Sequence, residues 1–352
     1  VDRGGLLRIG PESAGSYPGP VCYGKGNTRP TVTDANVVLG RINADKPIGG
    51  KLDRLDVDRA KAAIETHVGA PLNLSVMAAA EAIIRVANSK MAGAIRLVSI
   101  ERGHDPKNFS AMPFGGGGAL HTGALMKEVG LQSALVPRYP GINSALGCTI
   151  ADMRHDFVQT INGVLGRLDI DDLDQRMVEL AQQGLGMLQT AGVSFGGTAL
   201  QFELDMSYQG QTHTVDVAVP LDLKGDTTGV TEASVRAAFE TRYLAVYGRL
   251  LNNIPIRVLN LRVSALGKRP KFDLTLLAPA AGVSLAQARR GTRQVWFDGA
   301  FHETGVYERL PLSVGEIVPG PALLEQPDAT VFIEPDLTAR VDHFGNLVIS
   351  RK

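Results

Sequence analysis

Met112-Pro113-Phe114-Gly115-Gly116-Gly117-Gly118-Ala119-Leu120-His121-Thr122-Gly123 is the stretch that decides the fold. In it, a short apolar run breaks into four glycines and then resumes as a helix-like segment. Glycine admits a ligand against bare backbone, and unpaired N–H groups at the start of a following helix attract phosphate. The pattern predicts a strand, a nucleotide-cradling turn and a helix. A tight strand-to-helix turn that holds no ligand is the alternative.

Two common nucleotide-binding motifs do not match this stretch. A P-loop requires Gly-x-x-x-x-Gly-Lys-Ser/Thr, but Gly118 and Gly123, which have that glycine spacing, precede Ala124 and Leu125. A dinucleotide fingerprint requires a third glycine where His121 stands. The turn therefore belongs to neither the Walker nor the Rossmann class.

Composition sets the class of protein. The 352 residues are 44% apolar, enough for a large core, and Lys plus Arg equals Asp plus Glu at 36 each. Because the chain has no net charge and no long apolar run, we expect no nucleic-acid partner, no membrane association and a cytoplasmic location. Cys22 and Cys148 lack metal or redox spacing, and we expect both to be buried.

Hydrophobic periodicity predicts mixed α/β structure. Helices are expected over residues 57–68, 75–101, 119–129, 142–153, 171–189 and 230–247. Strands are expected over residues 132–136, 156–164, 200–208, 212–219 and 257–266, followed by short strands and Pro/Gly turns from residue 294 onward. We interpret the apolar stripe of residues 75–101 as helix packing and not as a ligand contact.

Specific strings spread along the chain carry a family resemblance. They are Gly10–Gly15, Pro18–Gly24, Thr31–Asn36, Leu39-Gly40-Arg41, the glycine turn with His121, Pro140–Gly147, Tyr208–Gln211, Tyr247-Gly248 and Gly320–Glu325. Together they make the sequence resemble the hydantoinase A / 5-oxoprolinase family, which is also similar to the ATP-binding subunits of acetone-type carboxylases.

The resemblance implies an α/β chain that forms part of an actin-like ATPase fold of the sugar kinase and chaperone type. It would be followed by an α+β domain and a small C-terminal β domain. We place these parts at residues 1–165, 166–280 and 281–352. ATP and Mg²⁺ are the implied cofactors. Gly115, Gly116, Gly117 and Gly118 match the family's adenosine-side turn, although its usual Gly-Ala-Gly-Pro is absent here, and Ser144 begins the helix that closes the cleft.

The implied activity is ATP-dependent activation of a carbonyl. The family phosphorylates the oxygen of a cyclic amide (hydantoin, 5-oxoproline or a similar lactam) or a ketone, and a hydantoinase B-like subunit then hydrolyses or carboxylates it. The family's first phosphate loop, a Gly-Gly-Thr hairpin, has no counterpart in this sequence, which begins at Val1. We therefore expect an N-terminal half on a larger or split polypeptide. A nucleotide-binding regulatory or scaffolding component without catalysis of its own is the alternative.

Two polar residues are candidate catalytic groups. Asp34, in a Thr-Val-Thr-Asp loop, could orient magnesium-bound water or a substrate amine, or it could cap the helix that starts at Ala35. His121 could donate to phosphates or pack beneath the turn. The seven histidines lack metal-site spacing, so we expect no transition metal, and no Gly-x-Ser-x-Gly or Cys nucleophile pattern occurs.

Overall fold

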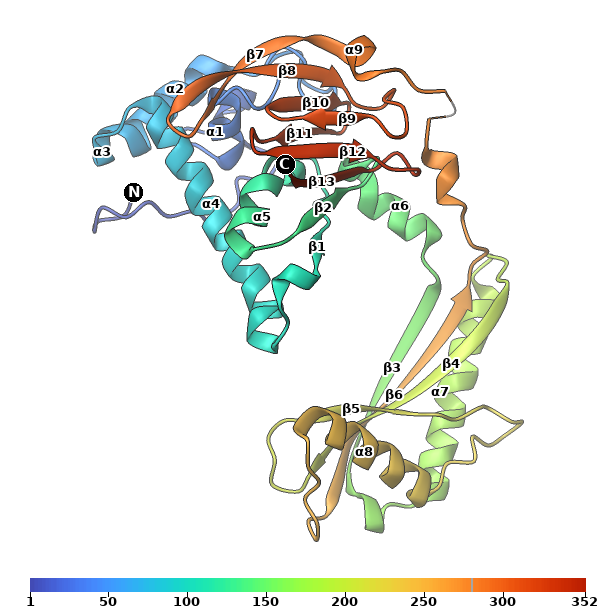
Figure 1. Ribbon diagram of the computed structural model, residues 1–352. Helices are drawn as coiled ribbons and strands as arrows, with labels where there is room; N and C mark the ends of the chain where they lie inside the picture. Colours follow the sequence, from blue (N-terminus) through green and yellow to red (C-terminus); the bar gives the residue numbers. More distant parts are fainter. Residues whose placement is uncertain (280) are drawn as a thin grey trace. The chain divides into compact units, whose positions relative to one another are not determined.

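The computed structural model describes residues 1–279 and 281–352 and divides the chain into two compact units (Figure 1). Unit 1 comprises Val1–Cys148 and Asp273–Lys352, and unit 2 comprises Thr149–Phe272. Both mix helices with sheets, so the mixed α/β class expected from the sequence is confirmed.

Two sheets form the framework of unit 1. The five-stranded sheet has the order β1 (Ser110–Ala111), β2 (Ser133–Val136), β13 (Leu347–Arg351), β12 (Leu337–Val341) and β9 (Ile317–Pro319). The four-stranded sheet has the order β11 (Ala329–Ile333), β10 (Ala322–Gln326), β8 (Ala300–Glu308) and β7 (Arg289–Phe297). Every residue of β11 is buried, as expected for a strand covered on both faces.

The C-terminal strands complete the sheet that the middle of the chain begins. In β13, Leu347 and Ile349 lie opposite Val136 and Ala134 of β2. All four side chains are at most 1% exposed, so both strands bury the same face. The units therefore differ from the three domains expected from the sequence, because residues 281–352 share a core with residues 1–148.

Helices surround this framework. They are α1 (Val32–Val38), α2 (Val57–Ile64), the short α3 (Ala70–Leu72), α4 (Val76–Val98), α5 (Thr122–Val129), α6 (Asn143–Ile150) and the short α9 (Leu285–Ala288). The side chains of Asp56 and Ser75 cap α2 and α4 by accepting backbone N–H bonds. Gly130, in the left-handed conformation, ends α5 as expected. In α6 no residue is buried, and Cys148 is exposed, so the expectation that both cysteines are buried was wrong for Cys148.

No single helix within residues 1–279 and 281–352 is long and apolar enough to cross a bilayer. Val57–Leu72 and Val76–Arg102 pass that test only as a pair, across a bend of 85°. The core residues Ile64, Ile83 and Ile84 of these segments are at most 4% exposed inside unit 1.

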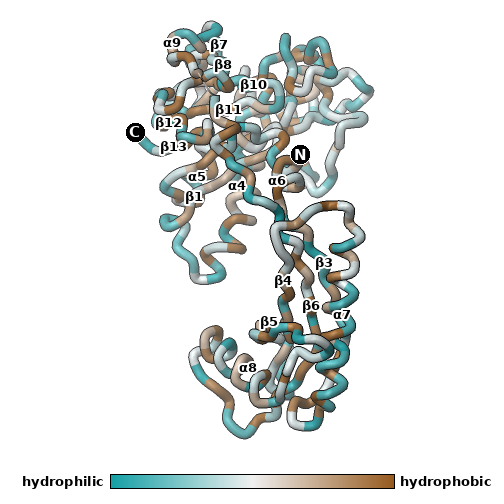
Figure 2. Tube along the Cα trace, turned by 90° about the vertical axis from the view of Figure 1, so that its right-hand side faces the viewer, coloured by the Kyte–Doolittle hydropathy of each residue, from teal (hydrophilic) through white to brown (hydrophobic). Residues whose placement is uncertain are grey.

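Unit 2 is an antiparallel sheet with helices on one face. Its strand order is β3 (Met153–Val164), β6 (Ile256–Lys268), β4 (Gly197–Tyr208) and β5 (Val215–Val219), with α7 (Ile170–Thr190) and α8 (Glu232–Tyr247) packed against it. The strands expected over residues 200–208 and 212–219 pair as the antiparallel hairpin of β4 and β5. Hydrophilic and hydrophobic residues alternate along α7, as expected for a helix with one buried face (Figure 2). Because β3 pairs with β6 along its length, residues 149–165 belong to this unit.

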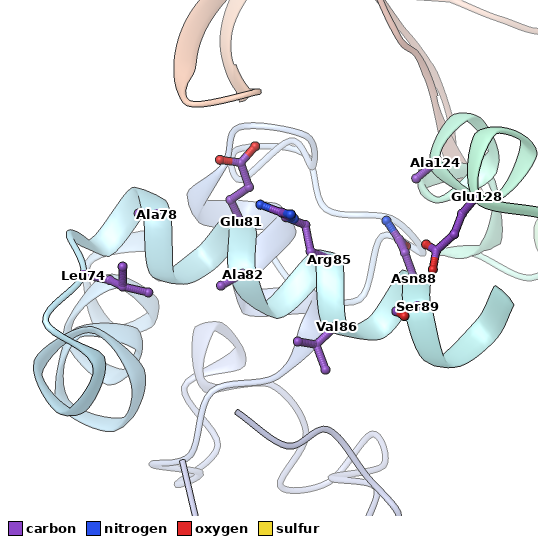
Figure 3. A pocket seen from close by; sticks show the side chains of 10 residues that line it. All are labelled: Leu74, Ala78, Glu81, Ala82, Arg85, Val86, Asn88, Ser89, Ala124 and Glu128. Carbon is purple, nitrogen blue, oxygen red and sulfur yellow. The ribbon is translucent and has the colours of Figure 1, made fainter. Parts of the chain in front are cut away.

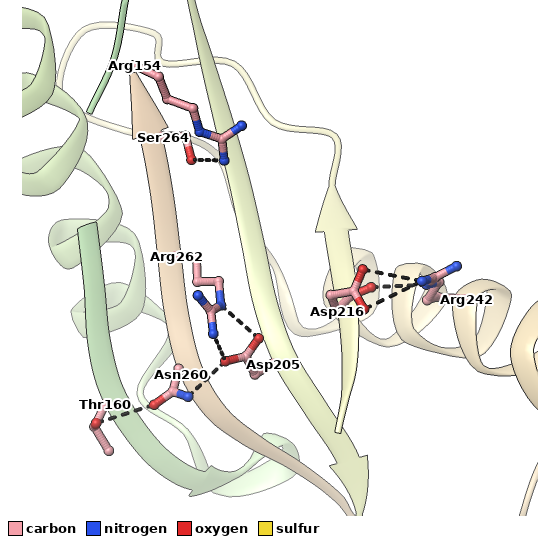
Figure 4. A network of polar contacts seen from close by, with 8 residues as sticks. All are labelled: Arg154, Thr160, Asp205, Asp216, Arg242, Asn260, Arg262 and Ser264. Carbon is pink, nitrogen blue, oxygen red and sulfur yellow. Dashed lines mark hydrogen bonds and ion pairs between the residues drawn. The ribbon is translucent and has the colours of Figure 1, made fainter. Parts of the chain in front are cut away.

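The opposite face of this sheet is polar (Figure 4). Asp205 accepts two hydrogen bonds from the Arg262 guanidinium, each 2.9 Å long, and one of 2.8 Å from Asn260. Burial opposes ionisation, but these bonds hold the pKa of Asp205 below its usual range. The alternation of apolar and polar residues along each strand thus fixes which face packs.

Two glycines of α7 test how closely this helix packs on the sheet. A Cβ at Gly184 would lie 2.6 Å from the Cβ of Ala265 and 3.1 Å from the Phe157 ring, whereas a Cβ at Gly186 would meet nothing within 4 Å. We expect Gly184→Ala to lower the free energy of unfolding by about 1–2 kcal/mol through overpacking. Gly186→Ala should raise it by about 1 kcal/mol through helix propensity. Urea denaturation of both variants measures this, and equal effects would contradict the packing.

Candidate functional site

The glycine turn is held in place at its first residue. Gly115 has a φ of +83°, which strongly favours glycine, and its N–H donates to the carbonyl of Pro140 at 2.7 Å. From Gly118 the chain winds into a short 3₁₀ turn, Gly118–Leu120, that leads into α5. The predicted order of strand, glycine turn and helix is therefore present, with only a two-residue strand, β1, before the turn.

Four consecutive amides of this turn lack an acceptor within the described chain, but Ala119 is fully buried, so only the three glycine amides can face a ligand. Within the described residues, the N–H groups of Gly116, Gly117, Gly118 and Ala119 donate to no acceptor. A Cβ at Gly117 would meet nothing within 4 Å, and one at Gly116 only the Asp328 carbonyl, at 3.4 Å. Unpaired amides beside open space at the start of a helix suit a phosphate or another acceptor-rich ligand.

Two further segments meet the glycine turn. The N–H of Gly141 donates to the Asp328 carboxylate at 2.8 Å, in the turn between β10 and β11. A Cβ at Gly141 would lie 2.3 Å from the Asp328 carbonyl oxygen, so no larger residue fits there without movement. The glycine turn, residues 140–141 and the β10–β11 turn therefore form one site, which we call the glycine site.

The buried guanidinium of Arg309 connects the segments that form the glycine site. Arg309, 3% exposed, donates to Gln326 at 2.8 Å and to the carbonyl of Val136 at 2.9 Å. Gln326 in turn donates to the carbonyl of Arg138 at 3.1 Å and to the Asp328 carboxylate. Burial, opposed in part by the Asp328 charge, lowers the pKa of Arg309 to about 9. This network joins the end of β2 to the β10–β11 turn.

Ser144 lies close in sequence to the glycine site but does not join this network. It is in the first turn of α6, three residues after Gly141, and is exposed. Within the described residues its side chain makes no hydrogen bond. The structure thus leaves the Ser144 hydroxyl free for a ligand or for another segment.

Asp34 caps a helix. It is fully buried, and its carboxylate accepts from the N–H groups of Val21, Cys22 and Thr31 at 3.1, 2.8 and 2.8 Å. With Thr31 it forms the capping box of α1. Burial and the Asp34 charge raise the pKa of the Cys22 thiol. Of the two roles open for Asp34, the geometry supports capping, since no part of the carboxylate reaches the surface.

His121 lies beneath the glycine turn and is 7% exposed. Its Nδ1 is 2.6 Å from the side-chain oxygen of Asn88 in α4. Because an amide oxygen only accepts, Nδ1 carries the proton. Burial, and then the Arg41 charge, lower the pKa of His121 to about 4, so the ring is neutral at pH 7. The second candidate role, packing beneath the turn, fits this placement.

Arg309, Gln326 and Asp328 stand in no motif that singled them out before the structure was known. The Gln326-Pro327-Asp328 turn between two apolar runs carries a hairpin signal that could have been noticed. Among the described residues, no group of three or more His, Cys, Asp or Glu side chains could hold a metal ion.

Comparison with known proteins gives matches over nearly the whole chain. A family model described as hydantoinase/oxoprolinase matches residues 1–157, and one described as hydantoinase/oxoprolinase C-terminal domain matches residues 169–349. An uncharacterised protein of Methanocaldococcus jannaschii is 36% identical over all of this chain and 49% of its own length. Caprolactamase subunit alpha of Pseudomonas jessenii is 33% identical over 97% of this chain and 49% of its own length. The chain thus spans about half the length of these relatives.

Two solved structures have a similar fold. The nucleotide-free structure of an acetone carboxylase, described as performing ATP-dependent carboxylation, superposes with a TM-score of 0.77 at 25% identity, over 99% of this chain and 50% of that one. The ATP-dependent caprolactamase of Pseudomonas jessenii superposes with a TM-score of 0.74 at 32% identity, over 100% of this chain and 51% of that one.

The buried neutral His121 predicts an acid-dependent loss of stability. With a folded pKa of about 4 and an ordinary value of 6.5, the unfolded chain binds more protons between these two pH values. Stability that is present above pH 6.5 is therefore lost as the pH falls toward 4, by up to about 3 kcal/mol. His121→Gln, which keeps a donor for Asn88, should show a smaller loss. Urea denaturation at pH 7 and pH 4.5 measures the difference, and equal losses in both proteins would contradict it.

Proposed function

The chain belongs to the hydantoinase/oxoprolinase family, and on that premise we propose that it is the C-terminal portion of an ATP-dependent activating subunit. Its substrate is a cyclic amide or a ketone, whose carbonyl oxygen receives a phosphoryl group. Relatives described as an ATP-dependent caprolactamase and an acetone carboxylase support this class of activity. A hydantoinase B-like subunit then hydrolyses or carboxylates the activated substrate.

The observation that carries this proposal is the run of unpaired amides at Gly116, Gly117 and Gly118, with open space beside Gly117. Backbone N–H groups fixed in advance can donate to the acceptor atoms of a nucleotide without reorganising when it binds. The Arg309–Gln326–Asp328 network would keep the turn fixed while a nucleotide enters. We assign the adenosine side of the nucleotide to Gly115–Gly118 and its closure to the Ser144 helix.

ATP would supply the phosphoryl group that turns an unreactive carbonyl oxygen into a leaving group. Mg²⁺ would accompany the nucleotide phosphates. Within this chain, the residues of the glycine site position the nucleotide and keep the turn rigid. Positioning is the protein's main task in phosphoryl transfer. We assign His121 to holding the turn through Asn88, and neither His121 nor Asp34 to the reacting atoms.

The remaining half of the site lies in other residues. Because the chain spans about half of its relatives, we propose that an N-terminal half supplies the first phosphate loop and completes an actin-like cleft. We place the assembled enzyme in the cytoplasm.

The test is ATP turnover by this chain combined with a polypeptide that carries the first phosphate loop and with the B-like subunit. Turnover should depend on added caprolactam, 5-oxoproline, hydantoin or acetone. Gly117→Val should weaken ATP binding at least about tenfold, since its methyl groups occupy the free space beside the amides. ATP binding that needs none of these substrates and drives no turnover would favour a regulatory or scaffolding component instead.

Gly197→Val is the matched control for this prediction. Gly197 begins β4 in unit 2, and a Cβ there also meets nothing within 4 Å. The control should keep the ATP affinity of the unchanged protein. Thermal unfolding of both variants checks that neither substitution disturbs the fold, and equal ATP affinities would contradict the assignment of the turn.

A further inference from the structure

A groove of about 740 Å³ runs along α4 where this helix faces α5 (Figure 3). Its walls carry the charged side chains of Glu81, Arg85 and Glu128 and the amide of Asn88. Ala78 and Ala82 give part of it an apolar surface. We call this the α4 groove. It differs from the glycine site in every lining residue.

The charged side chains in the α4 groove do not form ion pairs with one another within the described chain. Among residues 1–279 and 281–352, the side chains of Arg85 and Glu128 form no hydrogen bond and no ion pair. Figure 3 shows Arg85 between Glu81 and Asn88, with Glu128 reaching in from α5 beside Asn88. Glu81 is fixed by the indole N–H of Trp296 at 3.0 Å. The groove thus offers one cation flanked by two anions, and of these Arg85 and Glu128 have no partner within the described chain.

Asn88 provides an independent indication of a ligand. It is only 6% exposed, and His121 occupies its side-chain oxygen. Its side-chain N–H₂ group has no acceptor among the described residues, although it lines the groove. This nitrogen reaches the surface of the groove, so an acceptor bound there can complete its hydrogen bonding.

The spacing along α4 brings the donors together. Arg85 and Asn88 are three residues apart on a helix and therefore lie on one side of it. In Figure 3 the Arg85 guanidinium points toward Glu81, and a rotation of this exposed side chain toward Asn88 would let the guanidinium and the amide N–H₂ group match the two oxygens of a carboxylate. An inorganic anion would be repelled by Glu81 and Glu128, and a simple cation would be repelled by Arg85. A molecule that carries both charges can pair with the groups of opposite sign.

We propose that the α4 groove binds a small zwitterionic amino acid. Its carboxylate lies on Arg85 and the Asn88 amide, its ammonium lies on Glu128, and its carbon chain lies along Ala78 and Ala82. This choice of ligand rests on the proposed function, because opening a lactam ring with water yields one molecule that carries an amine and a carboxylate. The α4 groove is thus a site for the product class of the enzyme.

The α4 groove is connected to the glycine site by two residues. Asn88 binds His121, and the N–H of His121 donates to the carbonyl of Gly118 at 3.2 Å. A ligand that engages the Asn88 amide acts on the residue that supports the glycine turn. Occupancy of the groove should therefore change ATP affinity, which makes the site regulatory.

Isothermal titration calorimetry on this chain, without nucleotide, tests the proposal with 6-aminohexanoate and glutamate as probes. We expect 6-aminohexanoate, glutamate or both to bind with a Kd of about 1 mM or tighter. Hexanoate, hexylamine and uncharged caprolactam each lack at least one charge and should bind at least about tenfold more weakly than the zwitterion that binds. No binding of either zwitterion, or equal binding of the single-charge analogues, overturns the proposal.

Variants locate the site. Arg85→Gln and Glu128→Gln should each weaken zwitterion binding at least about tenfold without loss of thermal stability, since neither side chain has a partner among the described residues. Arg102→Gln is the matched control, because Arg102 is exposed like Arg85 and its side chain has no partner in the same part of the chain. Unchanged affinity in Arg85→Gln, or equal loss in Arg102→Gln, overturns the assignment.

The proposed function fails separately from this inference. Zwitterion binding without lactam- or ketone-dependent ATP turnover leaves the α4 groove as a site and removes the enzyme assignment. Turnover without zwitterion binding keeps the enzyme assignment and removes the α4 groove as a zwitterion site. The groove is then a surface for another polypeptide segment or for no ligand.

Discussion

The antiparallel pairing of β13 with β2 is the contact on which unit 1 depends. It joins residues 133–136 to residues 347–350, more than 200 positions away along the chain. Beyond the end of β2, the N–H of Gly141 donates to Asp328 in the β10–β11 turn of the other sheet, 187 positions further along the chain. The glycine site is therefore built from segments that are distant in sequence, although its most recognisable element is a local run of glycines.

The guanidinium of Arg309 shows how this pairing is converted into a rigid site. Taking a charge out of water is costly unless its donors are satisfied. Arg309 meets this condition in part: its two terminal nitrogens donate to Gln326 and to the carbonyls of Val136 and Pro137 at the end of β2, whereas its buried Nε has no partner among the described residues. Backbone carbonyls at a strand end have no ladder partner, so they are natural acceptors for it. One buried side chain thus satisfies the end of β2 and orients Gln326 toward Asp328.

Local signals predicted local structure well. The helices expected over residues 57–68 and 75–101 begin as α2 and α4, and the strands expected over residues 200–208 and 212–219 form β4 and β5, because the signals for them lie within a few residues. The partner of β2 could not be predicted in this way. The alternation of buried and exposed residues indicates that a segment is a strand, but it does not identify the strand with which it pairs. For the same reason the sequence identified Gly115–Gly118 but not Arg309 or Asp328. It also left two roles open for Asp34, since only burial separates a cap from a ligand.

The apolar stripe of helix α4 does not predict the role of Asn88. The buried positions of α4 include Ala80, Ile83, Ile84 and Ala87, and Asn88 shares their buried face. An amide at such a position is more informative than the hydrophobic residues around it, because a shielded polar group needs partners. One of its partners, His121, belongs to the glycine turn, and the other is missing from the described chain. The same side chain that helps to hold the turn therefore faces the α4 groove, and any ligand that completes its hydrogen bonding must act on both.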